Sequence, residues 1–220
     1  MSDQHLYRLN GLALMTGAIV AFLMLLYTGL FFIGHDPKAY VGNAAFVPVN
    51  LLLAGGAALV LVGLPGMFKI EANSVVGLVG MVLVFITGLM FGVFFSLLLA
   101  LVFPYLNAVA PAALGSEPPP SFGPFFIFGG IAQVVGLALL GVAILRGPSA
   151  QRWTGYVLVA AAAVGVADFI VSGPSGPSNV VANVFDNLSP LLLMIAVAGL
   201  GYDMWARSKS SLVVESLRAC

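Results

Sequence analysis

The stretch that decides the fold is VVGLVGMVLVFITGLMFGVFFSLLLALVF, which runs from Val75 to Phe103. Its twenty-nine residues include no charged side chain, and only Thr87 and Ser96 carry a polar group. As an α-helix the stretch would be about 43 Å long, at about 1.5 Å per residue. The hydrocarbon core of a bilayer is about 30 Å thick, and about 20 apolar residues cross it as a helix. The stretch therefore predicts a membrane-spanning helix with enough excess length to tilt.

The composition of the whole chain agrees with this prediction. Of its 220 residues, 61% are hydrophobic and only 7% are charged, whereas soluble domains carry about 25% charged residues. The net charge is zero and no run of basic residues occurs, which argues against nucleic acid as a partner. The single cysteine, Cys220, excludes an internal disulfide and a cysteine-rich metal site.

Five further apolar stretches lie on either side of the first, although two of them are short for a perpendicular crossing. We therefore expect an all-α fold, a six-helix membrane bundle in one integral membrane domain. The predicted spans are about residues 11–33, 48–64, 75–103, 124–145, 153–171 and 190–206, followed by a short tail at 207–220. The first span is about twice as long as the apolar part of a signal peptide, so we interpret it as a retained helix.

Prolines mark the expected ends of the helices. The prolines at the expected starts of the even-numbered spans are Pro48, Pro124 and Pro190, and the first helical position is one where the missing N–H has no helical partner to lose. Ser189 could then cap the last of these helices. Pro65 and Pro104 follow the second and third spans, and we expect them to end those helices.

The distribution of basic residues predicts the orientation. With six spans, both termini and two of the loops share one side of the membrane, and this side holds seven of the eight lysines and arginines. Because basic residues in short loops stay in the cytosol, we expect both termini to be cytoplasmic, in a bacterial-type plasma membrane. The outer side has one basic residue, Lys38, and four acidic ones: Asp36, Glu117, Asp168 and Asp186.

Small residues spaced four apart predict close helix packing. Gly88 and Gly92 form a GxxxG pattern, with Ser96 on the same face, and Ala161 and Gly165 repeat the spacing in the fifth span. Two interpretations remain open at this point. These residues either pack the helices of one chain together, or Gly88 and Gly92 form the seam of a homodimer.

Asp168 is the candidate for a ligand-binding or ion-binding residue. It lies fifteen residues after Trp153, and therefore about 22 Å along the fifth span, in the outer third of the membrane. A carboxyl group at such depth is either a hydrogen-bonded or interfacial group or part of a functional site. The other polar residues expected on the same side, as candidates for the same site, are Asp186, His35, Asp36, Gln133 and Asn50.

The sequence contains no familiar catalytic motif, and we expect no cofactor and no metal centre. The function that we favour is therefore a non-catalytic accessory or scaffold subunit, whose partners are the lipid bilayer and either a second copy or other membrane proteins. An alternative is transport or binding of a small cation, a proton or a hydrophobic molecule in an acidic outer vestibule centred on Asp168. A third is a lipid-acting membrane enzyme that uses His35.

Overall fold

The computed structural model describes residues 3–32, 41–71, 74–112, 122–147, 152–172 and 180–218. These residues are almost entirely helical and contain no strand. Within these ranges, six helices are long and apolar enough to cross a bilayer. The prediction of an all-α bundle of six membrane-spanning helices is therefore confirmed.

The third span differs from the others, because a π-helix interrupts it. Its parts are α4 (Val75–Thr87), the π-helix η1 (Gly88–Phe95) and α5 (Ser96–Val109), which together form one continuous helix that we call the third span. The other helices are α1 (Asp3–Phe32), α3 (Phe46–Glu71), α6 (Phe122–Arg146), α7 (Arg152–Ser172) and α8 (Val180–Arg218). Ser74 caps the start of the third span, since its hydroxyl accepts a hydrogen bond from the Gly77 N–H at 3.0 Å.

Three of the prolines do not lie at helix ends, contrary to expectation: we expected Pro65 and Pro104 to end helices and Pro190 to begin one. Pro65, Pro104 and Pro190 lie inside α3, α5 and α8, and α8 begins at Val180, ten residues before Pro190. The physical reason is that a helix end in or near hydrocarbon would leave several backbone groups unpaired, whereas an internal proline removes one hydrogen bond. Pro48 and Pro124 do lie in the first turns of α3 and α6.

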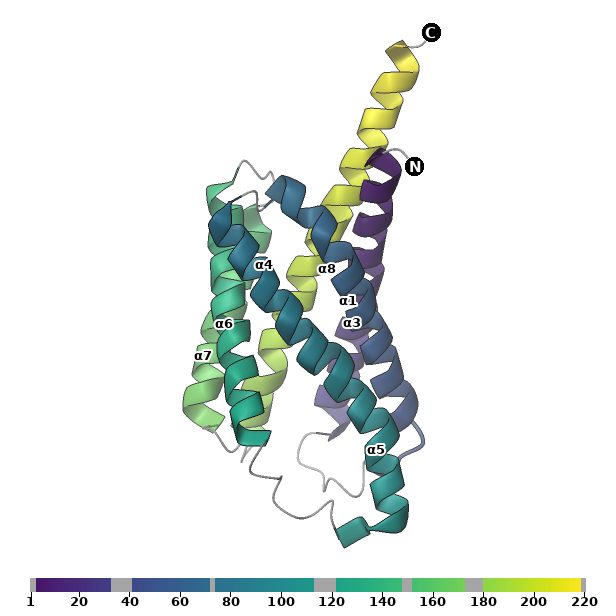
Figure 1. The fold of residues 1–220 in the computed structure, drawn as a ribbon, viewed down its shortest axis with the longest axis vertical. Coiled ribbons are helices and arrows are strands. Elements are labelled where there is room, and N and C mark those ends of the chain that lie inside the picture. Colours follow the sequence, from purple (N-terminus) through teal and green to yellow (C-terminus); the bar gives the residue numbers. More distant parts are fainter. Residues whose placement is uncertain are drawn as a thin grey trace.

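The helices form a closed ring in which neighbours in sequence are also neighbours in space (Figure 1). Helix α1 packs against both α3 and α8, and α7 packs against both α6 and α8. The third span crosses the bundle diagonally: α4 packs against α6, whereas η1 and α5 pack against α3. Both termini lie at one end of the ring, which we call the terminal end, and the opposite end is the far end.

Adjacent helices approach one another at glycines that face each other. At each such pair, a Cβ atom built on either glycine would lie 2.6–3.2 Å from the carbonyl oxygen of the other. The pairs are Gly17 with Gly56, Gly11 with Gly201, Gly80 with Gly136, and Gly141 with Gly155. They join α1 to α3, α1 to α8, α4 to α6, and α6 to α7. In lipid, where expulsion of water does not drive helices together, such close backbone contact is what favours association.

The glycines of the third span are also used within the chain. A Cβ on Gly92 would lie 2.7 Å from the Ala57 Cβ, and a Cβ on Gly88 would lie 2.9 Å from Leu61. Both contacts are with α3. Of the two interpretations of the GxxxG pattern, this geometry supports packing inside one chain.

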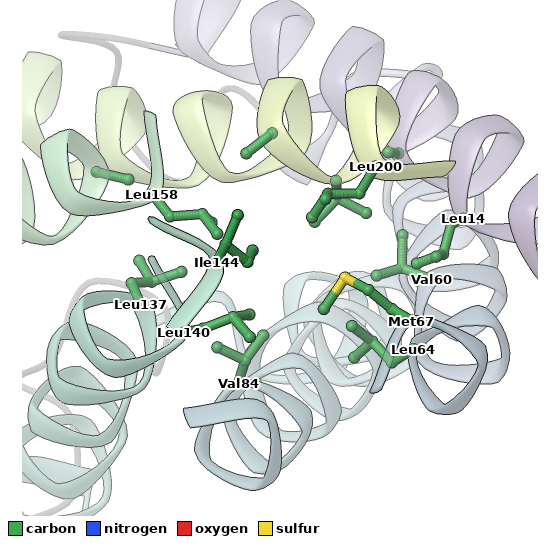
Figure 2. Packing of buried hydrophobic residues seen from close by; sticks show 14 of the residues in the cluster. Leu14, Val60, Leu64, Met67, Val84, Leu137, Leu140, Ile144, Leu158 and Leu200 are labelled. Carbon is green, nitrogen blue, oxygen red and sulfur yellow. The ribbon is translucent and has the colours of Figure 1, made fainter. Parts of the chain in front are cut away.

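Buried apolar side chains fill the interior of the ring near the terminal end (Figure 2). They come from every helix around the ring, and each is at most 8% exposed. Members such as Leu64, Leu140, Ile144, Leu158 and Leu200 point toward one another. Most of this dry core lies in the half of each helix closer to the terminal end, and none of the polar candidates is part of it.

The glycine contacts predict opposite behaviour for two adjacent residues of α3. Gly56→Ala should lower the free energy of unfolding by roughly 1–3 kcal/mol, because its Cβ would meet the Gly17 carbonyl oxygen at 2.9 Å. Gly55→Ala is the matched control, since its Cβ would meet nothing within 4 Å. Unfolding by SDS titration in mixed micelles measures both changes, and equal stability of the two variants would contradict the packing described.

Candidate functional site

The structure brings Asp168 and Asp186 together at the far end of the bundle. Asp168 lies in the last turns of α7 and is half-buried, whereas Asp186 lies in the early part of α8 and is exposed. Their carboxylates are close enough to interact electrostatically. Two of the acidic residues that we predicted for the same site therefore form a pair.

A contact between α7 and α8 sets this geometry. The Ser189 hydroxyl donates a buried hydrogen bond to the Ala161 carbonyl oxygen at 3.0 Å. We had expected Ser189 to cap a helix, but its hydroxyl joins two helices instead. A Cβ on Gly165 would lie 3.4 Å from the same hydroxyl oxygen. Asp168 follows Gly165 by three residues and Asp186 precedes Ser189 by three, which places both carboxylates about one turn beyond this contact.

The pair is an electrostatically unfavourable arrangement when both groups are ionised. Two carboxylates at short range repel one another, and a cation or a proton held by either group relieves the repulsion. The far end of α7 and α8 can therefore attract a cation, but the two carboxylates by themselves provide few ligands for one.

Asn50 is not part of this pair. It is only 2% exposed, and its side-chain amide donates a hydrogen bond to the Phe46 carbonyl oxygen of its own helix at 2.8 Å. It belongs to α3, which packs against α1 and the third span, whereas Asp168 lies on α7 between α6 and α8. Its side-chain amide is thus bonded within α3 and buried there.

Gln133 is half-buried on α6. It precedes Leu137 by four residues and Leu140 by seven, so it shares their inward face and lies one turn closer to the far end. His35 and Asp36 lie outside the described residues. Among the described residues, no group of three or more histidine, cysteine, aspartate or glutamate side chains could hold a metal ion.

A cluster of five phenylalanines was not predicted from the sequence. Phe91 and Phe95 of η1 contact Phe125 and Phe126 near the start of α6, with ring centroids 5.5–5.8 Å apart across the two helices. Phe122 packs against Phe125 and Phe126 within α6. The Phe91 ring lies over Gly129, where a Cβ would be 2.3 Å from the ring. These rings connect α6 to the part of the third span that lies against α3.

The terminal end carries a different set of side chains. Arg207 forms an ion pair with Asp203, one turn earlier in α8. The rings of Tyr202 and Trp205 lie 6.1 Å apart on the same helix, and the Trp153 ring packs against Gly199. Aromatic residues of this kind are enriched where a membrane meets water.

No protein-family model, curated protein or solved structure matches this chain significantly. The functional conclusion therefore rests on the fold and on the site geometry. Its six apolar helices make the chain a multi-pass membrane protein.

Proposed function

We propose that this protein is a non-catalytic accessory or scaffold subunit that binds another membrane protein through the outward face of its third span. It does so in a bacterial-type plasma membrane, with both termini in the cytosol, as the basic residues at the terminal end predict. The observation that carries the proposal is the dry core. It favours a protein that binds a partner over one that conducts an ion through its interior.

The dry core closes the interior of the ring. Leu64, Leu140, Ile144 and Leu200 are each at most 1% exposed and come from α3, α6 and α8. An ion that crossed the bundle would have to pass among these side chains without water or polar partners, which is costly. This packing supports a protein that acts through its outer surface.

The third span offers the largest outer surface. It is the longest span, with 35 residues, and only 17% of its most apolar stretch is buried inside the bundle, against 28–50% for the other five spans. Phe94, Leu101 and Tyr105 are 59–64% exposed along it. Apolar side chains at this depth face either lipid or a second membrane protein, and packing against a protein is the use that a scaffold requires.

Photo-cross-linking in cells tests this surface. A p-benzoylphenylalanine side chain at Phe94 should give a discrete cross-linked protein product, because that ring is 59% exposed on the proposed face. Phe31 on α1 and Phe128 on α6 are matched controls, since they are phenylalanines that are 56% and 57% exposed on other helices.

The controls should give lipid adducts alone. Mass spectrometry of the Phe94 product then identifies the partner, either a second copy of the chain or a different protein. Lipid adducts alone at all three positions would contradict the proposal, and so would the same protein product at all three.

A second candidate function is cation binding at the far end, which the proximity of Asp168 and Asp186 favours. The pair lies outside the dry core, so a cation could bind there without crossing the bundle. Carboxylate oxygens are the ligands that Ca²⁺ prefers. This function would add to the scaffold role and does not require flux.

Thermal unfolding in detergent tests the second candidate. If the pair binds a cation, Ca²⁺ should raise the Tm of the natural chain, and Asp186→Asn should abolish the rise. Asp203→Asn is the matched control on the same helix, because Asp203 pairs with Arg207 at the opposite end and should leave the Ca²⁺-dependent rise intact. An equal response of all three chains to Ca²⁺ would exclude this site.

A further inference from the structure

The third span changes its packing partner at the π-helix. On the terminal side, α4 is held against α6 by the close contact between Gly80 and Gly136. On the far side, η1 and α5 lie against α3, where Gly88 and Gly92 face Leu61 and Ala57. The segment Gly88–Phe95 thus joins two halves of one helix that belong to different sides of the ring (Figure 1).

A π-helix is a place where the register of a helix can change. Its hydrogen bonds run from residue i to i+5 instead of i+4, so it accommodates one more residue than an α-helix would. If the segment became α-helical, the residues beyond it would rotate by about 100° about the helix axis, the angle that one residue occupies at 3.6 residues per turn. Such segments are rare and often occur at functional sites.

Hydroxyl groups stand at both borders of this segment. Thr87, immediately before it, donates to the carbonyl oxygens of Leu83 and Val84 at 3.1 Å. Ser96, immediately after it, donates to the Phe91 carbonyl oxygen, five residues earlier, at 3.4 Å. In lipid, hydroxyls of this kind satisfy backbone groups that an irregular helix leaves weakly bonded.

These two hydroxyls are the only polar side chains between Val75 and Phe103. They are 4% and 1% exposed, so neither is directed to lipid or to water. Ser96 thus bonds to a backbone group of the π-helix, and Thr87 bonds to the last turn of α4 directly before it.

The far half has two sets of contacts that a rotation would change. Toward α3, a Cβ on Gly88 or Gly92 would lie within 3 Å of Leu61 or Ala57, so a rotation about the helix axis must also widen this contact. Its contacts with α6 are made by the rings of Phe91 and Phe95. In the present register the Phe91 ring lies over Gly129, which has no side chain to block it. A change of register would move these rings away from Phe126 without disturbing the contact between Gly80 and Gly136.

We propose that Gly88–Phe95 is a conformational switch. It interconverts between the π-helix seen here, with the phenylalanine contact to α6 made, and an α-helix in which the far half of the third span has rotated and that contact is broken. The switch is a property of the fold and does not depend on a partner, so its test is independent of the proposed scaffold function.

Spin-label distances in nanodiscs test the switch, in a chain carrying Cys220→Ser. Labels at Leu101 and Ile131, both exposed to lipid, report on the far half of the third span relative to α6. Labels at Val79 and Val135 are the control pair, because they lie beside the contact between Gly80 and Gly136. The far pair should show two distance populations, and the control pair should show one.

Substitutions of the bordering hydroxyls should shift these populations. Thr87→Val and Ser96→Ala should each raise the rotated population about threefold, the effect of losing one hydrogen bond within a membrane. Thr16→Val is the matched control, because Thr16 makes the same backbone hydrogen bonds, to Leu12 and Ala13, within a regular helix. It should leave the distances unchanged.

Deletion of Leu89, which faces lipid, removes the extra residue and should convert the far pair entirely to its rotated distance. A single far distance that is the same in the natural chain and in both hydroxyl variants would overturn the proposal. A deletion variant that fails to fold would also overturn it, because the rotated state would then be inaccessible.

Discussion

The structure depends on backbone-to-backbone contact at paired glycines. Lipid tails are as apolar as the side chains they touch, so expulsion of water cannot hold six such helices together. Close approach of the backbones can hold them together, and it requires that no Cβ atom lie between the helices. The contact between Gly11 and Gly201 has a special place among the pairs, because it joins the first span to the last and closes the ring. The dry core lies inside the ring that this contact closes, whereas the position of the acidic pair depends on the contact between α7 and α8.

The sequence was sufficient for the number and approximate place of the spans, because hydropathy over twenty residues is a strong local signal. The prediction was wrong at Pro65, Pro104 and Pro190, because a proline marks either end of a helix reliably only where water can bond the backbone groups left unpaired there. The spacing of Gly88 and Gly92 predicted close packing. It could not show that the partner was α3, because the same spacing serves contacts within and between chains.

The site was partly predictable for a similar reason. The depth of Asp168 can be counted from the start of its helix, and the count singled it out. Its approach to Asp186 depends on how α7 and α8 pack through Ser189, which is a tertiary contact with no signature in the sequence. The π-helix had only an indirect sign, the hydroxyls of Thr87 and Ser96 in an otherwise apolar stretch. The orientation in the membrane is inferred from the distribution of charge, and the binding of another membrane protein is inferred from the exposure of the third span. Both are proposals.

The structure is a ring of helices closed by glycine contacts, with a dry apolar core near the terminal end and a third span that a π-helix interrupts. The feature on which the ring depends is the contact between the first and last spans. Magic-angle-spinning NMR in lipid bilayers measures this directly, through ¹³C–¹³C cross-peaks between the backbones of Gly11 and Gly201. The account predicts a cross-peak of short-range intensity. Its absence, in a sample that shows the expected contacts within α1 and within α8, would contradict the closed ring.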